Sequence, residues 1–209
     1  MSNLTSLQEK NTTDSGLVLP GDADAWFERK FEESMQKREA AKTPSMAIVV
    51  TKGTLDWAYP PFILASSASA LGWDVSLFFT FYGLSLLKKE LDLEISPLGN
   101  PAMPMKMPFG PGWFQDINWN MPNAVMGNVP GFEKMATTLM KKTMHNKGVA
   151  SIEELRELCL EAEVKMIACQ MTVDLFGWNM DDFVPEVADW VGATSFLPTA
   201  QQADVTMFI

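Results

Sequence analysis

The stretch KMIACQMTVDLFG, residues 165–177, decides the fold predicted for this chain, because an apolar run ends there on a cysteine and a helix follows. Residues 164–168 follow a charged helix and have the short apolar run that is typical of a buried parallel strand. Cys169 then lies at the carboxyl end of that strand. Apolar residues recur at near-helical spacing over 170–176, and Gly177 is placed to end the helix.

This position of Cys169 suits a reactive thiol. A cysteine at a helix N-terminus feels the positive end of the helix dipole and several unpaired backbone N–H groups, which favour the thiolate. Ligands of open α/β sheets also bind at the carboxyl ends of the strands. Cys169 is therefore the predicted catalytic residue, and this role requires a sulfur atom that solvent can reach. The alternative is a small core residue without chemistry, since cysteine is among the most buried residue types.

The rest of the chain alternates between strand and helix patterns. Strands are predicted at 45–50, 75–80, 164–168, 185–189 and 205–209. Helices are predicted at about 22–42, 60–71, 84–91, 131–145, 170–176 and 191–203, with one more opening at the capping box of Ser151. This alternation predicts an α/β fold with a mostly parallel, five-stranded sheet covered on both faces.

The chain divides into two predicted regions. Residues 1–44 form a polar tail and an amphipathic helix, and residues 45–209 form one α/β domain. The domain contains an insertion at about 96–130 that is rich in proline, methionine and tryptophan. Without nearby histidine or cysteine, the methionines there favour an apolar surface for a protein partner over a Cu(I) site.

Composition excludes several classes of function. The net charge of -10 gives no electrostatic footprint for nucleic acid. Only two cysteines and no secretory pattern at the N-terminus predict a reducing, cytoplasmic setting. The apolar region 57–87 is broken by prolines and glycines into pieces too short for a membrane span. The hydrophobic content of 47% predicts apolar surface for a homo-oligomer or a partner.

A few other residues are candidates for a site around Cys169. Lys52 and Gly53 follow the first strand, and Lys52 is either a solvated turn residue or a cation that stabilises the sulfur anion. The backbone N–H groups of Gln170 and Met171 are predicted to contribute to the same anion site. Cys159 lies on the apolar face of a helix and is most simply a core residue.

No cofactor and no metal are predicted. The turn at 51–54 is too short and too poor in glycine to cradle a phosphate. His145, the single histidine, follows lysines at the end of a helix, where a surface residue suits the helix dipole. A Cys–His dyad stays open as an alternative.

Three stretches carry a resemblance to a known family. They are MAIVVTKGTLDWAYPPFILASSASALGWDVSLFFTFYGLSLLKK, then NVPGFEKMATTLMKKTMHNKGVASIEELRELCLEAEVKMIACQMTVDLFGW, and the closing ADVTMFI. Over about 45–209 the chain resembles the DsrE-like family of sulfur-trafficking proteins, in particular the soluble DsrE/DsrF-like members often labelled peroxiredoxin-family proteins. The segment IACQMTVDLFGW is the most specific part of the match.

The resemblance implies a three-layer α/β/α fold that assembles into oligomers. It also implies a sulfur carrier or sulfurtransferase, with a cysteine at the position of Cys169 that holds sulfur as a persulfide or a thiosulfonate. Such proteins exchange sulfur with TusA-like partners, in sulfur oxidation or in sulfur relay for tRNA modification. Some relatives use a second, upstream cysteine, so Cys159 is a possible second thiol.

Two other functions remain open at this stage. A thiol peroxidase would form a sulfenic acid on Cys169 and would need Cys159 to reach it as a resolving thiol. A non-catalytic, oligomeric binding subunit would use the Met- and Trp-rich insertion, and its Cys169 would be inert.

Overall fold

The computed structural model describes residues 23–96, 106, 107, 109–118, 128 and 130–209. The chain forms two compact units, residues 1–42 and residues 43–209. The predicted tail and most of the predicted insertion lie outside the described residues. Within the insertion, the short helix α3 (Gly112–Gln115) is described.

The described part of the first unit is the helix α1 (Ala23–Ala41), which confirms the predicted leading helix. Its first turn contains Asp24 and its last turn Arg38, the charge order that the helix dipole favours. No residue of α1 is buried, and the side chains of Phe27, Phe31 and Met35 form an exposed stripe at a spacing of four residues. What this stripe contacts stays a prediction.

The second unit is built on a five-stranded sheet, as predicted. Its strands are β1 (Ser45–Val50), β2 (Asp74–Phe79), β3 (Lys165–Cys169), β4 (Asp189–Val191) and β5 (Val205–Phe208). They lie in the order β4-β3-β2-β1-β5, and every pairing between neighbours is parallel. All five strands therefore end at the same side, called here the carboxyl edge of the sheet.

Two apolar cores lie on opposite faces of this sheet, because alternate residues of a strand point to opposite faces. Ile48, Leu77 and Met166 belong to a large core that also includes buried residues of α2 (Leu55–Ala70) and α6 (Ile152–Glu161). Ala47, Phe78, Ile167 and Cys169 belong to a smaller core that is covered by Phe196. Phe196 is the buried residue of α8 (Ala193–Gln202).

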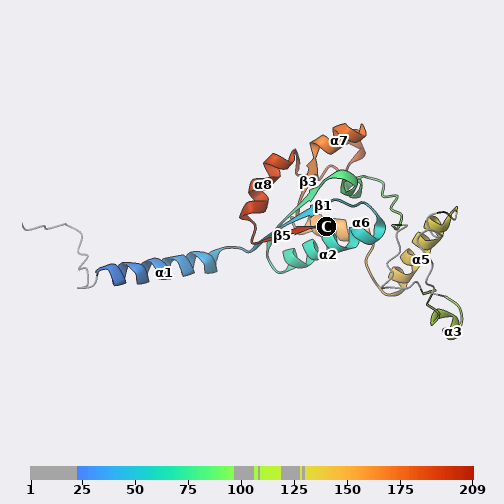
Figure 1. Ribbon diagram of the computed structural model, residues 1–209, viewed down its shortest axis with the longest axis horizontal. Helices are drawn as coiled ribbons and strands as arrows, with labels where there is room; N and C mark the ends of the chain where they lie inside the picture. Colours follow the sequence, from blue (N-terminus) through green and yellow to red (C-terminus); the bar gives the residue numbers. More distant parts are fainter. Residues whose placement is uncertain (1–22, 97–105, 108, 119–127, 129) are drawn as a thin grey trace, which may run out of the picture. The chain divides into compact units, whose positions relative to one another are not determined.

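Figure 1 shows the resulting layers, with α2 and α6 on one side of the strands and α8 on the other. This arrangement confirms the three-layer α/β/α prediction. The helix α5 (Phe132–Asn146) adds Met140 and Met144 to the large core. Its bounds, and the capping box of Ser151 at the start of α6, also agree with the sequence pattern.

Three local predictions were wrong. The helix α2 begins at Leu55 rather than near Pro60, because Leu55, Ala58 and Tyr59 already pack into the core one turn earlier. The segment after β2 is a 3-10 helix, η1 (Phe81–Leu87), rather than an α-helix.

The third difference concerns the edge strand. The chain before β4 is held at η1, since Val184 N donates to the Leu87 carbonyl and Phe183 bridges to Lys88. Pairing with β3 therefore begins only near Ala188, whose N–H donates to the Met166 carbonyl. The strand β4 starts at Asp189, the residue at which the predicted strand was to end.

Across the described residues, no helix has both the length and the apolar character needed to cross a membrane. The apolar region 57–87 is divided among α2, β2 and η1, as predicted.

Candidate functional site

Cys169 occupies the predicted junction between a strand and a helix. It is the last residue of β3 and the N-cap of α7 (Gln170–Phe176), with extended backbone angles. Gly177 ends α7 in the left-handed conformation at φ 62, which glycine adopts without a steric penalty. The local sequence signals are therefore confirmed on both sides of the cysteine.

The sulfur atom of Cys169 is not open to solvent, contrary to the requirement stated for a reactive thiol. The residue is only 2% exposed and lies in the smaller core beneath α8. The ring of Phe196 stacks on the ring of Phe78 in this core, with 4.5 Å between the centroids. Among the described residues, no side chain or backbone group hydrogen-bonds the Cys169 sulfur. The helix that covers this sulfur lies more than twenty residues later in the chain, so the local sequence pattern did not reveal it.

The first turn of α7 holds the two backbone groups predicted to face the sulfur anion. Gln170 and Met171 are its first two residues, so their N–H groups have no acceptor within the helix. The Gln170 side chain donates from Nε2 to Asp174 Oδ1 at 2.9 Å and so braces the next turn of α7. The Met171 side chain is exposed.

Lys52 and Gly53 take part in other contacts. The Lys52 ammonium lies over the ring of Trp57, at 3.1 Å from its centroid, and β2 lies between β1 and β3. Gly53 packs so closely on η1 that a Cβ atom there would lie 2.2 Å from the Tyr82 carbonyl oxygen. In this conformation the structure does not bring the Lys52 cation to Cys169.

Thr172 is a site residue that the sequence analysis missed. Its buried hydroxyl accepts a hydrogen bond from Phe81 N at 3.2 Å and lies 3.3 Å from the Thr80 hydroxyl. These contacts fix α7 against the exit of β2, next to Cys169. A single threonine within an apolar helix pattern gives no signal for such a contact.

Cys159 lies on the opposite face of the sheet from Cys169. It is fully buried in the large core, and its thiol donates weakly to the Phe62 carbonyl at 3.6 Å. Burial raises the pKa of the Cys159 thiol to about 11, because the low-polarity surroundings disfavour the thiolate. The structure therefore does not bring the two cysteines together.

The raised pKa of Cys159 predicts that stability falls at alkaline pH. A folded-state pKa of about 11, against an ordinary pKa of 9.0, means that folding favours the protonated thiol. The contribution is complete below pH 9 and is lost as the pH rises through 11, by roughly 3 kcal/mol in total at about 1.4 kcal/mol per pKa unit. Urea unfolding between pH 8 and pH 11 measures this loss.

The Cys159→Ala variant is the matched control for this titration. The pKa of Tyr59 is also raised, chiefly by burial and then by Glu153 and Glu154, so some alkaline loss will remain in the variant. The difference between the two proteins isolates the Cys159 thiol. Equal slopes above pH 9 would contradict a desolvated thiol at this position.

His145 is exposed at the end of α5, away from both cysteines in the fold, and no Cys–His dyad is found among the described residues. It lines a hollow of about 240 Å³ together with Tyr59, Lys141, Glu153 and Glu154.

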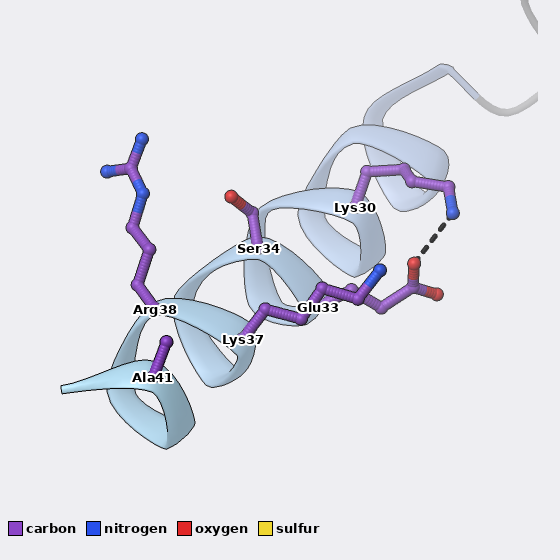
Figure 2. Close-up of a pocket in the computed structure, with 6 residues that line it drawn as sticks. All are labelled: Lys30, Glu33, Ser34, Lys37, Arg38 and Ala41. Carbon is purple, nitrogen blue, oxygen red and sulfur yellow. Dashed lines mark hydrogen bonds and ion pairs between the residues drawn. The ribbon is translucent and has the colours of Figure 1, made fainter.

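A second hollow lies on α1 alone. Figure 2 shows Lys30 and Glu33 of that helix pointing toward one another, with an ion pair of 2.6 Å, whereas Arg38 points away. Side chains of one exposed helix do not enclose a ligand.

Comparisons with known proteins identify relatives of this chain. The model of the DsrE/DsrF/DrsH-like family matches residues 42–208. "Sulfur carrier protein DsrE2" of Allochromatium vinosum is 56% identical over 164 residues, which cover 78% of this chain and 97% of that protein. The uncharacterized protein YrkE of Bacillus subtilis is 29% identical over 171 residues, covering 80% of this chain and 98% of YrkE.

Among solved structures, the ychN protein from E. coli matches with a TM-score of 0.40 and 12% sequence identity. That match covers 80% of this chain and 100% of ychN. The family match spans the whole sheet, both cores and the segment around Cys169. The chain belongs to the DsrE/DsrF/DrsH-like family.

Proposed function

We propose that this protein is a sulfur carrier in which Cys169 holds sulfane sulfur, as a persulfide or a thiosulfonate, and passes it to a partner protein. The observation that carries the proposal is the 56% identity to "Sulfur carrier protein DsrE2" over 97% of that protein. The position of Cys169 at the carboxyl end of β3 supports it, since ligands of parallel α/β sheets bind at the carboxyl ends of the strands.

The proposed loading step is nucleophilic. The Cys169 thiolate attacks a sulfane sulfur of the donor, a new S–S bond forms, and the donor's own S–S bond breaks. With tetrathionate, the products are a Cys169 thiosulfonate and free thiosulfate, so atoms and charge balance. The N–H groups of Gln170 and Met171 are the proposed donors to the bound anion. Lys52 would join them only by leaving the Trp57 ring.

Burial of Cys169 adds a condition to this function. Neither a donor nor a partner reaches Cys169 while the residue is 2% exposed, so loading requires the smaller core to open, and the proposed moving part is α8, which adds Phe196 to that core. Phe196 is the one buried residue of α8, and the other contacts of the helix are the packing of Ala200 on the smaller core and a hydrogen bond from the Thr206 hydroxyl to the Ala200 carbonyl, so few contacts hold it closed.

The setting and partners are also proposals. Both cysteines are free, which suits a reducing cytoplasm. A TusA-like carrier is the proposed partner, in sulfur oxidation or sulfur relay. Exposed apolar side chains on several elements support a homo-oligomer.

Intact mass spectrometry tests the proposal directly. The native protein is incubated with thiosulfate or tetrathionate, and its mass is measured before and after reductant. Wild-type protein and Cys159→Ser are expected to gain a sulfur or thiosulfonate group that reductant removes. Cys169→Ser is expected to gain nothing, and loading of this variant would show that the assignment is wrong.

The peroxidase alternative meets an obstacle in the fold. An intramolecular disulfide would have to join Cys169 to Cys159, and these residues lie in cores on opposite faces of the sheet. Treatment of the protein with peroxide tests this alternative. A sulfenic acid on Cys169 in the mass spectrum, together with rapid peroxide turnover, would support the peroxidase function.

A further inference from the structure

A group of exposed apolar side chains lies on η1 and on α7, the helix that begins directly after Cys169. Phe81 and Tyr82 of η1 are 51% and 67% exposed, and Met171 and Leu175 of α7 are both 65% exposed. These four residues are called here the corner patch. The Thr172 hydroxyl joins the two segments by accepting from Phe81 N, and the Tyr82 ring lies 5.8 Å from the ring of Phe176. Met171 is two residues from Cys169, so the patch adjoins the predicted site.

The backbone of Phe81 adopts an unusual conformation, which its hydrogen bond to Thr172 helps to hold. Its φ is 48, in the left-handed region that a bulky side chain rarely adopts. The side chain gains little burial in return, since half of it remains exposed. Strain of this kind is most often kept where function requires the side chain to be presented.

The surroundings of the corner patch are acidic. From residue 166 to the end, the chain has no Lys, Arg or His, and three of its acids follow Cys169 closely in the chain, namely Asp174, Asp181 and Asp182. Asp174 lies on α7, and Asp181 and Asp182 lie in η2 (Met180–Asp182), all exposed.

The lysines of the neighbouring segments, Lys52, Lys88 and Lys89, are engaged in internal contacts, Lys52 with the Trp57 ring as described above. Lys88 Nζ lies 4.1 Å from the centroid of the Trp178 ring, and Lys89 Nζ donates to the Asp181 carbonyl at 2.7 Å. A second copy of this chain would bring the same acids to the contact, and like charges disfavour such pairing.

We infer that the corner patch is the docking surface for a different protein, one that presents a cysteine thiolate among apolar side chains with lysine or arginine around them. This inference rests on the proposed function, because it places the sulfur acceptor beside Cys169. The partner thiolate attacks the outer sulfur of the Cys169 persulfide and forms a new S–S bond. The bond to Cys169 breaks, its thiolate is released, and the proton of the persulfide leaves with the transferred sulfur.

Two cysteine peptides serve as probes in the test. Both have the same apolar residues around one cysteine, and one is flanked by lysines where the other has glutamates. The full-length protein is loaded with sulfur, and the loss of sulfur from Cys169 is followed by intact mass. The lysine peptide is expected to react about tenfold faster at low ionic strength, with most of this difference lost at about 0.5 M salt.

Variants separate the apolar and the charged parts of the surface. Met171→Ser and Leu175→Ser are expected to slow transfer to the lysine peptide about threefold or more, and Asp174→Asn to reduce the preference between peptides. Leu71→Ser is the matched control, since Leu71 is 75% exposed at the far end of α2, and transfer should not change. Phe81→Gly should slow transfer while leaving the unfolding midpoint unchanged or raised, because glycine relieves the strain at φ 48.

Three results would contradict the inference. Normal loading with equal rates for both peptides, or with unchanged rates in the patch variants, would show that the corner patch does not receive the partner. Sedimentation that reveals loss of self-association in Met171→Ser, with transfer unchanged, would make the patch an interface between copies of this chain. Absence of loading in wild-type protein would reject the proposed function and this inference together.

Discussion

Replacing Phe196 with alanine is expected to raise the rate at which Cys169 reacts with a thiol reagent by about 100-fold. Phe196 is the buried side chain that holds α8 over the smaller core, where it stacks on Phe78. Removing a buried phenylalanine costs about 3–5 kcal/mol, and a loss of about 3 kcal/mol from the closed state would increase local opening about 100-fold. Native thiol titration with Ellman's reagent, in the Cys159→Ala background, measures the rate at Cys169 alone.

Leu197→Ala is the control for this experiment. Leu197 lies beside Phe196 on α8 but is 60% exposed, so its truncation should change the rate by no more than about twofold. Urea unfolding of both variants shows whether a faster rate comes from opening of α8 or from global unfolding. A Cys169 that labels only after denaturation, in both variants, would favour the inert thiol of a non-catalytic binding subunit.

The continuous apolar strands were the most predictable part of the fold. Parallel strands covered on both faces are rich in consecutive apolar residues, so the runs at 46–50 and 166–168 could be found without the structure. The edge strand β4 has only three residues, and its start depends on how Val184 is held by the Leu87 carbonyl. A contact between segments so far apart in the sequence leaves no local pattern.

For the site too, the local features were predictable from the sequence and the contacts between distant segments were not. The apolar run, the cysteine and Gly177 place Cys169 at a strand-to-helix junction, because each of these signals is local. The cover of Phe196, and the separation of Lys52 from Cys169 by β2, depend on the order of strands and helices in space. The strained Phe81 depends on a hydrogen bond to Thr172, ninety-one residues away.

Gly83→Ala is expected to destabilise the protein by about 3 kcal/mol, the upper end of the usual cost of overpacking, because the neighbouring atoms are rigid backbone. A Cβ atom on Gly83 would lie 2.3 Å from the Val50 carbonyl oxygen and 2.7 Å from its carbon. These are backbone atoms of β1, which is paired on both sides and has no room to shift. The midpoint of urea unfolding measures the loss.

Gly53→Ala is expected to act on the same contact from the other side. Its Cβ would lie 2.2 Å from the carbonyl oxygen of Tyr82, so either substitution forces η1 away from the exit of β1. The same displacement of η1 relieves the clash that either alanine causes. The double variant should therefore lose less stability than the sum of the losses in the two single variants. Gly112→Ala is the control, since nothing lies within 4 Å of its Cβ position, and it should change stability by no more than about 0.5 kcal/mol. If Gly83→Ala were as mild as this control, η1 would not pack on β1 at backbone distance, and the position of Phe81 and Tyr82 beside Cys169 would lose its support.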